Sequence, residues 1–218
     1  MKKYLFTIII LLSNTLTFAQ FELKGTMGIY FTSIPSMQDY INFSGFASNN
    51  QLSSFVSSVM FAGEAGIFIS PDFETTLEVA YQLYSYTNGS SDGQYDLTFS
   101  NVMPTVFAYY VITGTGYNFK FGGGLGARFV NVDESPPASE FKTYNSVGYG
   151  IVGRIEGNTL LGGNVYANIG FDIRYDVNGE PENDGTPLHN NLQNENVNFN
   201  ALSIGVRLGI TYIIGGNN

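Results

Sequence analysis

The sequence predicts an all-β fold: an eight-stranded antiparallel transmembrane β-barrel with short periplasmic turns and longer outer loops. Three observations predict it. Apolar residues alternate with small or polar ones through long segments, as in strands that have one apolar face. Charged residues make up 12% of the chain, below the ~25% of ordinary soluble domains, whereas Gly, Tyr and Phe are abundant. Beyond the N-terminal segment, no apolar run approaches the ~18 residues of a membrane-spanning helix.

Residues 1–20 are expected to be a signal peptide. Lys2 and Lys3 form a short positive region, an uncharged apolar run follows, and small residues precede a cleavage site at about Ala19. Residues 21–218 then form one outer-membrane β-barrel domain. Loss of the two lysines takes the net charge from −9 to −11, which argues against nucleic acid as a partner. The chain has no cysteine, so disulfides and thiolate metal sites are excluded.

Eight segments carry the alternating pattern. They are expected at residues 22–31, 58–69, 74–87, 95–112, 117–132, 141–155, 160–177 and 199–214. In the fourth segment the alternation slips, because Leu97 and Phe99 follow one phase whereas Val102 and Val106 follow the other. A β-bulge near residues 101–104 would shift the phase by one residue and accommodate a proline.

The connections alternate in character. Short turns are expected at residues 70–73, 113–116 and 156–159, and longer or more polar connections at 32–57, 88–93, 133–140 and 178–198, the first with a helical turn. Short periplasmic turns and longer outer loops around an even number of strands are typical of a transmembrane barrel. Pairing the last strand with the first would leave no open edge in the lipid.

The charged residues within the strands fall on the inward phase of this pattern. Of the seven basic residues after Lys3, only Lys142 lies at a strand margin. A charge on the lipid face would cost about 2–4 kcal/mol at the midplane, whereas opposite charges inside can pair. The predicted lumen charge network is Lys24, Glu64, Glu78, Lys120, Arg128, Arg154, Asp172, Arg174 and Arg207, with Glu22, Asp96 and Asp176 expected on the same phase.

This network has two interpretations. Eight strands enclose a space that side chains just fill, which favours a packed polar core. The alternative is a narrow path for ions or small solutes. The inward glycines are compatible with both, since they either make room for long arginine side chains or leave a narrow cavity.

No cofactor or metal site is expected, and the protein is predicted not to be an enzyme. The single histidine, His189, lies in a polar loop without a serine nearby in the sequence. Oxygen-bearing residues at alternate positions from Asp176 to Asp184 faintly resemble a calcium loop, but their spacing does not fit the EF-hand. The glycines of residues 122–126 lie inside a strand pattern and open no helix, so they are not a nucleotide-binding motif.

The last strand carries the most specific motif. Arg207, Gly209, Tyr212 and Ile214 follow the order polar, any, Gly, two residues, aromatic, any, hydrophobic. This resembles the C-terminal assembly signal of small Gram-negative outer-membrane β-barrel proteins, the eight-stranded set that includes OmpA-like and OmpW-like barrels. The final residue of the motif is Ile rather than Phe, and four residues follow it. Residues 102–110 and 121–126 are also similar to the porin-family barrel domain of the Bacteroidota type.

The resemblance implies a place in the cell outer membrane, in contact with outer-membrane lipid. It also implies export through the Sec pathway and insertion by the barrel assembly machinery. It transfers no functional residue, because these proteins share an architecture and not a site.

The expected function is that of a non-catalytic integral outer-membrane protein, either structural or a narrow passage for small solutes. The alternative is a surface binding, adhesion or partner-docking module whose outer loops contact a ligand. The aromatic residues of segment 32–57 favour that alternative, since exposed apolar patches often mark contact sites; they are Tyr40, Phe43, Phe46 and Phe55. A soluble lipocalin-like barrel is a third option, but it would place apolar side chains inside and polar ones outside.

Overall fold

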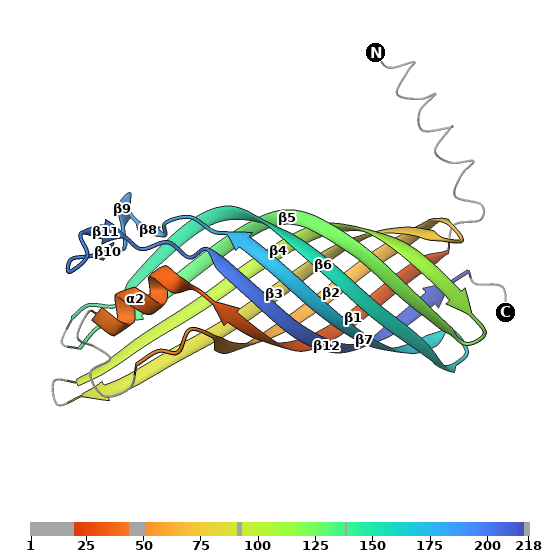
Figure 1. Cartoon of the computed structure of the whole chain (residues 1–218), viewed down its shortest axis with the longest axis horizontal. Coiled ribbons are helices and arrows are strands. Elements are labelled where there is room, and N and C mark those ends of the chain that lie inside the picture. The colour runs from red at the N-terminus through yellow and green to blue at the C-terminus, as the bar shows by residue number, and fades with distance from the viewer. Residues whose placement is uncertain (1–19, 44–50, 91–92, 138, 216–218) are drawn as a thin grey trace, which may run out of the picture.

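The computed structural model describes residues 20–43, 51–90, 93–137 and 139–215, which form a closed β-barrel (Figure 1). Most of the predicted signal peptide lies outside these residues. The wall consists of eight long antiparallel strands: β1 (Phe21–Ser33), β2 (Val56–Ser70), β3 (Phe73–Ser90), β4 (Gly93–Gly114), β5 (Tyr117–Ser135), β6 (Lys142–Gly162), β7 (Val165–Val177) and β12 (Ala201–Ile214). β12 pairs with β1 along the whole of β1, so these eight strands form a ring without an open edge. The predicted fold class is confirmed.

The two ends of the barrel differ. Two-residue turns at residues 71–72, 115–116 and 163–164 connect strands at one end. Gly116 and Gly163 have positive φ angles of 77° and 54°, which glycine adopts without steric cost. The other end carries α2 (Pro35–Phe43) and the short strands β8 (Glu182–Asn183), β9 (Thr186–Pro187), β10 (His189–Asn190) and β11 (Glu195–Asn196), which gather at the left of Figure 1. We call these the turn end and the loop end. No described helix is long and apolar enough to cross a membrane.

Two connections differ from the sequence prediction. The third turn lies at residues 163–164 and not at 156–159, because β6 continues through Glu156 and Asn158, whose side chains are buried and paired inside the barrel. The second outer connection is only two residues long, since β3 and β4 stay paired up to Ser90 and Gly93. The helical turn expected in segment 32–57 is the nine-residue helix α2.

The predicted bulge in β4 is wrong. The register between β3 and β4 stays constant over the length of β4, and inward residues alternate with outward ones throughout. Leu97 and Phe99 point inward, so Asp96 points outward, where it accepts a hydrogen bond from Thr87, and not into the lumen as predicted. The physical reason is that the loop end of the lumen holds an apolar core, so apolar side chains occupy the inward phase there.

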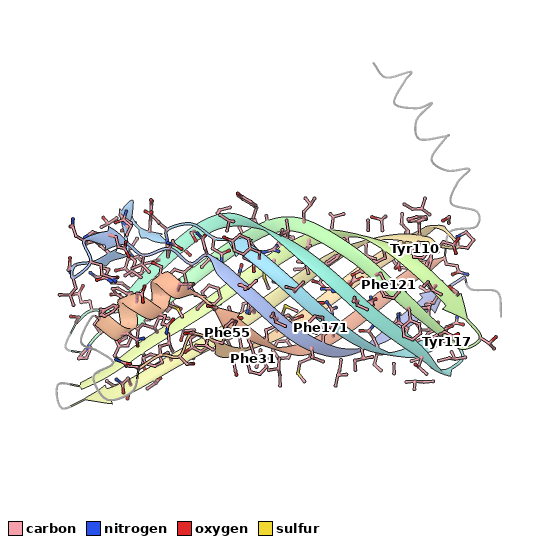
Figure 2. All side chains as sticks on the ribbon, in the orientation of Figure 1. Phe31, Phe55, Tyr110, Tyr117, Phe121 and Phe171 are labelled. Carbon is pink, nitrogen blue, oxygen red and sulfur yellow. The ribbon has the colours of Figure 1, made fainter. Side chains whose placement is uncertain are left out.

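The outward face of the wall is an apolar belt (Figure 2). Tyr110 and Tyr117 project outward near the turn end, while Phe31 and Phe171 do so nearer the middle. Apolar and aromatic side chains with about half of their surface exposed cover all eight long strands. A belt of this kind is stable only against lipid, which is the reverse of a soluble lipocalin-like barrel.

Candidate functional site in the barrel lumen

The structure places every residue of the predicted lumen charge network inside the barrel. Each of the nine side chains belongs to a residue that is at most 5% exposed. Glu22 and Asp176 lie in the lumen as well. Sequence reasoning missed Glu74 and Glu156, the first because it follows a turn and the second because it was assigned to one. The ion network of the described lumen therefore contains seven carboxylates and six basic groups.

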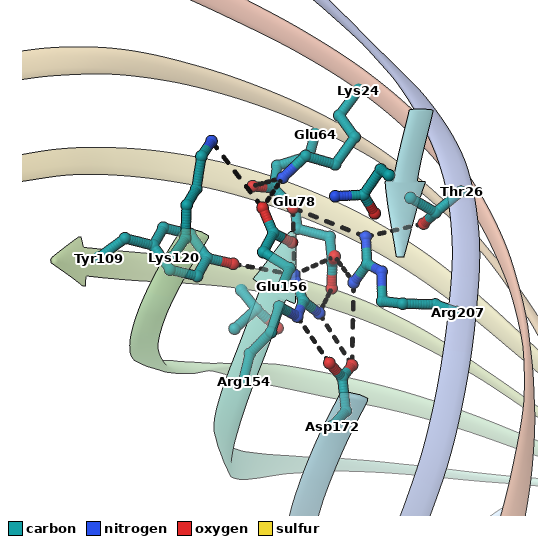
Figure 3. A network of polar contacts seen from close by, with 12 residues as sticks. Lys24, Thr26, Glu64, Glu78, Tyr109, Lys120, Arg154, Glu156, Asp172 and Arg207 are labelled. Atoms are coloured by element: carbon teal, nitrogen blue, oxygen red, sulfur yellow. Dashed lines mark hydrogen bonds and ion pairs between the residues drawn. The ribbon is translucent and has the colours of Figure 1, made fainter. Parts of the chain in front are cut away.

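Arg154 on β6 occupies the centre of this network (Figure 3). Its guanidinium donates two hydrogen bonds to Asp172, of 2.8 and 3.0 Å, and lies 2.8 Å from Glu78 and 3.1 Å from Glu64. It also donates to the Tyr109 hydroxyl at 3.0 Å. The planar fork of donors allows arginine to hold several carboxylates at once. Arg154 therefore connects strands from opposite sides of the barrel.

Arg207 and Arg174 extend the central group. Arg207 on β12 donates to Glu78 at 2.6 Å and to the Thr26 hydroxyl at 2.7 Å. The guanidinium of Arg174 donates to the Met103 sulfur at 3.0 Å and lies over the ring of Tyr30. Cations next to aromatic rings and carboxylates keep their charge compensated away from water.

Two lysines hold the glutamates nearer the turn end. The Lys24 ammonium lies 2.5 Å from Glu156, 3.1 Å from Glu64 and 3.2 Å from Glu22. Lys120 lies 2.6 Å from both Glu22 and Glu74. The oxygens of Glu22, Glu64 and Glu156 are close enough together for a metal ion, but the Lys24 ammonium lies among them. We therefore interpret this cluster as a lysine-centred ion network.

Nearer the loop end, Arg128 forms a separate pair. Its Nε contacts Asp176, and its Nη1 donates to the Thr105 hydroxyl at 3.2 Å. Charged groups thus extend along the lumen from Lys120, near the start of β5, to Arg128 on the same strand. The network crosslinks the wall from inside, because each ion pair of Arg154 and Arg207 joins different strands.

The inward glycines make room for large side chains. A Cβ atom on Gly124 would lie 2.7 Å from the Phe107 ring, and one on Gly170 would lie 2.8 Å from Arg207. At Gly205 it would overlap the ring of Tyr30. Each of these glycines is therefore covered by a neighbour's side chain, so its missing Cβ does not leave a channel.

An apolar cluster closes the loop end of the lumen. Met37 and Ile41 of α2 pack into it together with inward residues of the wall and of the seventh connection, which is the segment of residues 178–200 between β7 and β12. The rings of Phe99 and Phe199 stack at 5.7 Å inside it. We call this cluster the apolar cap; its buried members are Ile34, Met37, Ile41, Leu52, Val56, Tyr86, Tyr95, Leu97, Phe99, Val130, Val132, Tyr144, Leu188, Val197, Phe199 and Ala201.

Polar contacts fix α2 on the barrel. The Tyr40 hydroxyl donates to the buried Glu134 carboxylate at 2.6 Å. Burial, and next the Glu134 charge, raise the pKa of Tyr40 well above its ordinary value, so the phenol keeps its proton. Of the other aromatic residues in this connection, Phe43 and Phe55 are exposed and Phe46 lies outside the described residues.

The residues of the predicted assembly signal divide between the two faces of β12. Arg207 is part of the lumen network, and Gly209 lies where a Cβ would overlap the backbone of β1. Tyr212 and Ile214 face outward, with 45% and 44% of their surface exposed. Their availability on the outer face suits recognition during insertion, and that role stays a prediction.

We expect Tyr212→Asp to lower the amount of folded barrel in the outer membrane, whereas Asn217→Ala, outside the motif, should leave it unchanged. The aspartate would remove the aromatic signal residue and place a charge on the lipid face. The measurement is the heat-modifiable, folded band in outer-membrane fractions. Equal folded amounts of the two variants would contradict the assembly role of Tyr212.

The polar residues at the end of β7 and in the seventh connection do not converge on one point. Asp176 pairs with Arg128 in the lumen, and the Asn178 amide donates to the Phe199 carbonyl. Glu180 instead accepts a hydrogen bond from Asn196 on the surface. His189 is also exposed, with its Nδ1 3.0 Å from the Asn196 amide oxygen. Because these side chains bind separate partners, the oxygens at alternate positions that resemble a calcium loop do not surround a common point.

No protein-family model and no curated protein matches the sequence. Several solved structures share the fold. They include the attachment invasion locus protein Ail of Yersinia pestis in complex with the heparin analogue sucrose octasulfate (TM-score 0.54, 9% identity, covering 90% of this chain and 99% of that chain). Neisserial surface protein A has a TM-score of 0.50, with 14% identity over 88% of this chain and 96% of that chain. A major outer membrane protein from Thermus thermophilus has a TM-score of 0.51, with 12% identity over 90% of this chain and 99% of that chain.

These identities show similarity of fold alone. Together with the ring of eight strands and the apolar belt, they define the class of the protein: a small eight-stranded β-barrel of the Gram-negative cell outer membrane. The class and the localisation agree with the sequence prediction. The finer likeness to the Bacteroidota porin-family domain stays a prediction.

Proposed function

We propose that this protein is a non-catalytic outer-membrane barrel with a closed lumen, which presents a binding surface at its loop end. The observation that carries the proposal is the apolar cap, which fills the loop end of the lumen above the ion network. A barrel closed in this way acts as a rigid membrane anchor. The loop end is then the part of the molecule available to partners outside the cell.

The lumen network supports the closed state. A conducting pore needs sites that hold an ion weakly enough to release it. Here the charged side chains bind one another at hydrogen-bonding distance and are buried. An ion that entered would have to displace lysine or arginine from their carboxylates, which is costly in a medium of low dielectric constant.

The construction of the loop end supports the binding role. α2 is held by the Tyr40–Glu134 hydrogen bond, and the backbone N–H of Asn198 donates to the Ser36 hydroxyl at 3.0 Å. Segments that are fixed before binding lose less conformational entropy when a partner binds. Ail, which has the same fold, is described in complex with a heparin analogue, so a barrel of this shape is compatible with ligand binding.

Conductance in planar lipid bilayers tests the closed state. The refolded full chain is expected to give no defined openings, while an open porin in the same bilayers serves as a positive control for insertion. Reproducible single-channel steps from this protein would contradict the proposal and favour a narrow passage for small solutes.

A further inference from the structure

The loop end carries a large excess of negative charge. Six of the seven basic residues after Lys3 are buried in the lumen, so Lys142 is the only basic side chain of the described loop end. Carboxylates outside the ion network are numerous at this end, and among the described ones only Glu134 is buried, next to Tyr40 and Tyr95 of the loop end. The exposed or half-buried ones are Asp39, Asp96, Asp133, Glu140, Glu180, Glu182, Asp184 and Glu195. Such a surface attracts cationic partners and repels anionic ones.

A cleft of about 450 Å³ opens on this acidic surface between α2 and the segment before β12. One wall contains lining residues from segment 33–39 and the other from segment 195–202, and Tyr175 of β7, which pairs with Leu202, extends the second wall. The hydrogen bond from the Asn198 backbone to Ser36 joins the two walls, so the cleft is formed before any ligand arrives. The cleft lies beside the apolar cap, with which it shares Ala201, and its outward-facing residues Tyr175 and Leu202 belong to the upper edge of the apolar belt.

The lining of the cleft points to one kind of ligand. Asp39 and Glu195 offer carboxylates that form no ion pair or hydrogen bond with any residue that the structure describes, and none of the described lining residues is basic. Tyr175 is 49% exposed and provides an aromatic face. Pro35 and Leu202 add apolar surface. Carboxylates and an aromatic ring bind a cationic head, while apolar walls bind a methylene stem.

We propose that the cleft is a docking site for a basic polypeptide segment, with a lysine or arginine side chain seated between Asp39 and Glu195 against Tyr175. The inference rests on the proposed binding function of the loop end and names its partner class. A bare divalent ion would use the carboxylates but leave the ring and the apolar walls without a role. An anionic glycan would be repelled, because the described loop end exposes eight carboxylates and a single lysine.

The test uses the full chain, refolded and placed in phosphatidylcholine nanodiscs, with a fluorescein-labelled oligoarginine peptide as the probe. Fluorescence anisotropy is expected to report binding that weakens as the salt concentration rises. The double variant Asp39→Asn/Glu195→Gln should weaken the apparent Kd about tenfold or more. The matched control Asp96→Asn/Asp133→Asn removes two carboxylates of the same end outside the cleft and should change Kd by about twofold or less. Tyr175→Leu should weaken binding without changing its salt dependence.

The outcomes separate the cleft from the charge of the whole surface. Equal weakening by the two double variants would overturn the cleft as the docking site. If spermine displaces the peptide with an affinity equal to that of the peptide, the ligand of the cleft is a free polyamine and not a polypeptide. If calcium displaces the peptide from the wild-type protein, the ligand is a divalent ion. An absence of peptide binding would overturn the docking site in the cleft but not the closed lumen, because the bilayer measurement tests the closed lumen separately. Heat-modifiable migration on gels verifies that each variant is folded.

Discussion

Replacing Arg154 with methionine is expected to lower the free energy of unfolding by about 3–5 kcal/mol. The change leaves the buried Asp172 without its closest cation and leaves Glu78 with Arg207 as its one remaining partner at hydrogen-bonding distance, while the volume of the side chain is roughly kept. Uncompensated buried charges cost far more than a lost surface contact. Equilibrium unfolding in urea, with the barrel in lipid vesicles, measures the effect.

Lys142→Met is the matched control for Arg154→Met. It removes the same charge from an exposed position and should change the free energy of unfolding by no more than about 0.5 kcal/mol. The double variant Arg154→Met/Asp172→Asn should recover part of the loss, because it removes one of the stranded charges. If Arg154→Met and Lys142→Met unfold at the same urea concentration, the lumen network does not stabilise the barrel.

Replacing Leu208 with arginine is expected to lower the free energy of unfolding by about 2–4 kcal/mol. Leu208 lies in the middle of β12, faces outward with 61% of its surface exposed, and pairs with Met27 and Ile169 in the apolar belt. An arginine there must either lose its hydration or distort the surrounding lipid. The same urea titration in vesicles measures this loss.

Leu192→Arg provides the control for the lipid-face substitution. Leu192 is the same residue type and is even more exposed, but it lies in the seventh connection at the loop end. Arginine in water costs little, so this variant should stay within about 0.5 kcal/mol of the wild type. A similar loss in both variants would mean that the wall around β12 does not face lipid.

The alternation of apolar and polar residues was sufficient to predict which side chains of the wall point inward for most of the strands. Lys120 and Arg128 share the phase of the inward glycines on β5, and only one phase of a lipid-facing strand can carry charge. The sequence therefore predicts that Lys120 and Arg128 both point into the lumen. Glu156 was not predictable in this way, because a glycine and an asparagine follow it and the local composition indicates a turn. Only its pairing with Lys24 across the lumen reveals its position.

The loop end could not be predicted from local patterns. Leu97 and Phe99 are apolar and inward, as are Met103 and Phe107 further along β4, so charge does not mark the inward phase of this strand. Leu97 and Phe99 point inward because they pack in the apolar cap with residues from α2 and the seventh connection. Tyr40 resembled an exposed aromatic residue, but it is bonded to Glu134 from β5. These contacts join segments that are far apart in the sequence, so no short window contains the information.

The pairing of β1 with β12 has a consequence for how the protein is made. These two strands come from opposite ends of the described chain, so the last backbone contacts of the wall cannot form before the final strand is available. A chain that stops short of β12 would keep β1 and β7 as unpaired edges, which neither lipid nor water tolerates well. Contacts at such long sequence separation also form slowly. The time between synthesis and ring closure is therefore the period in which this chain is most vulnerable to aggregation and proteolysis.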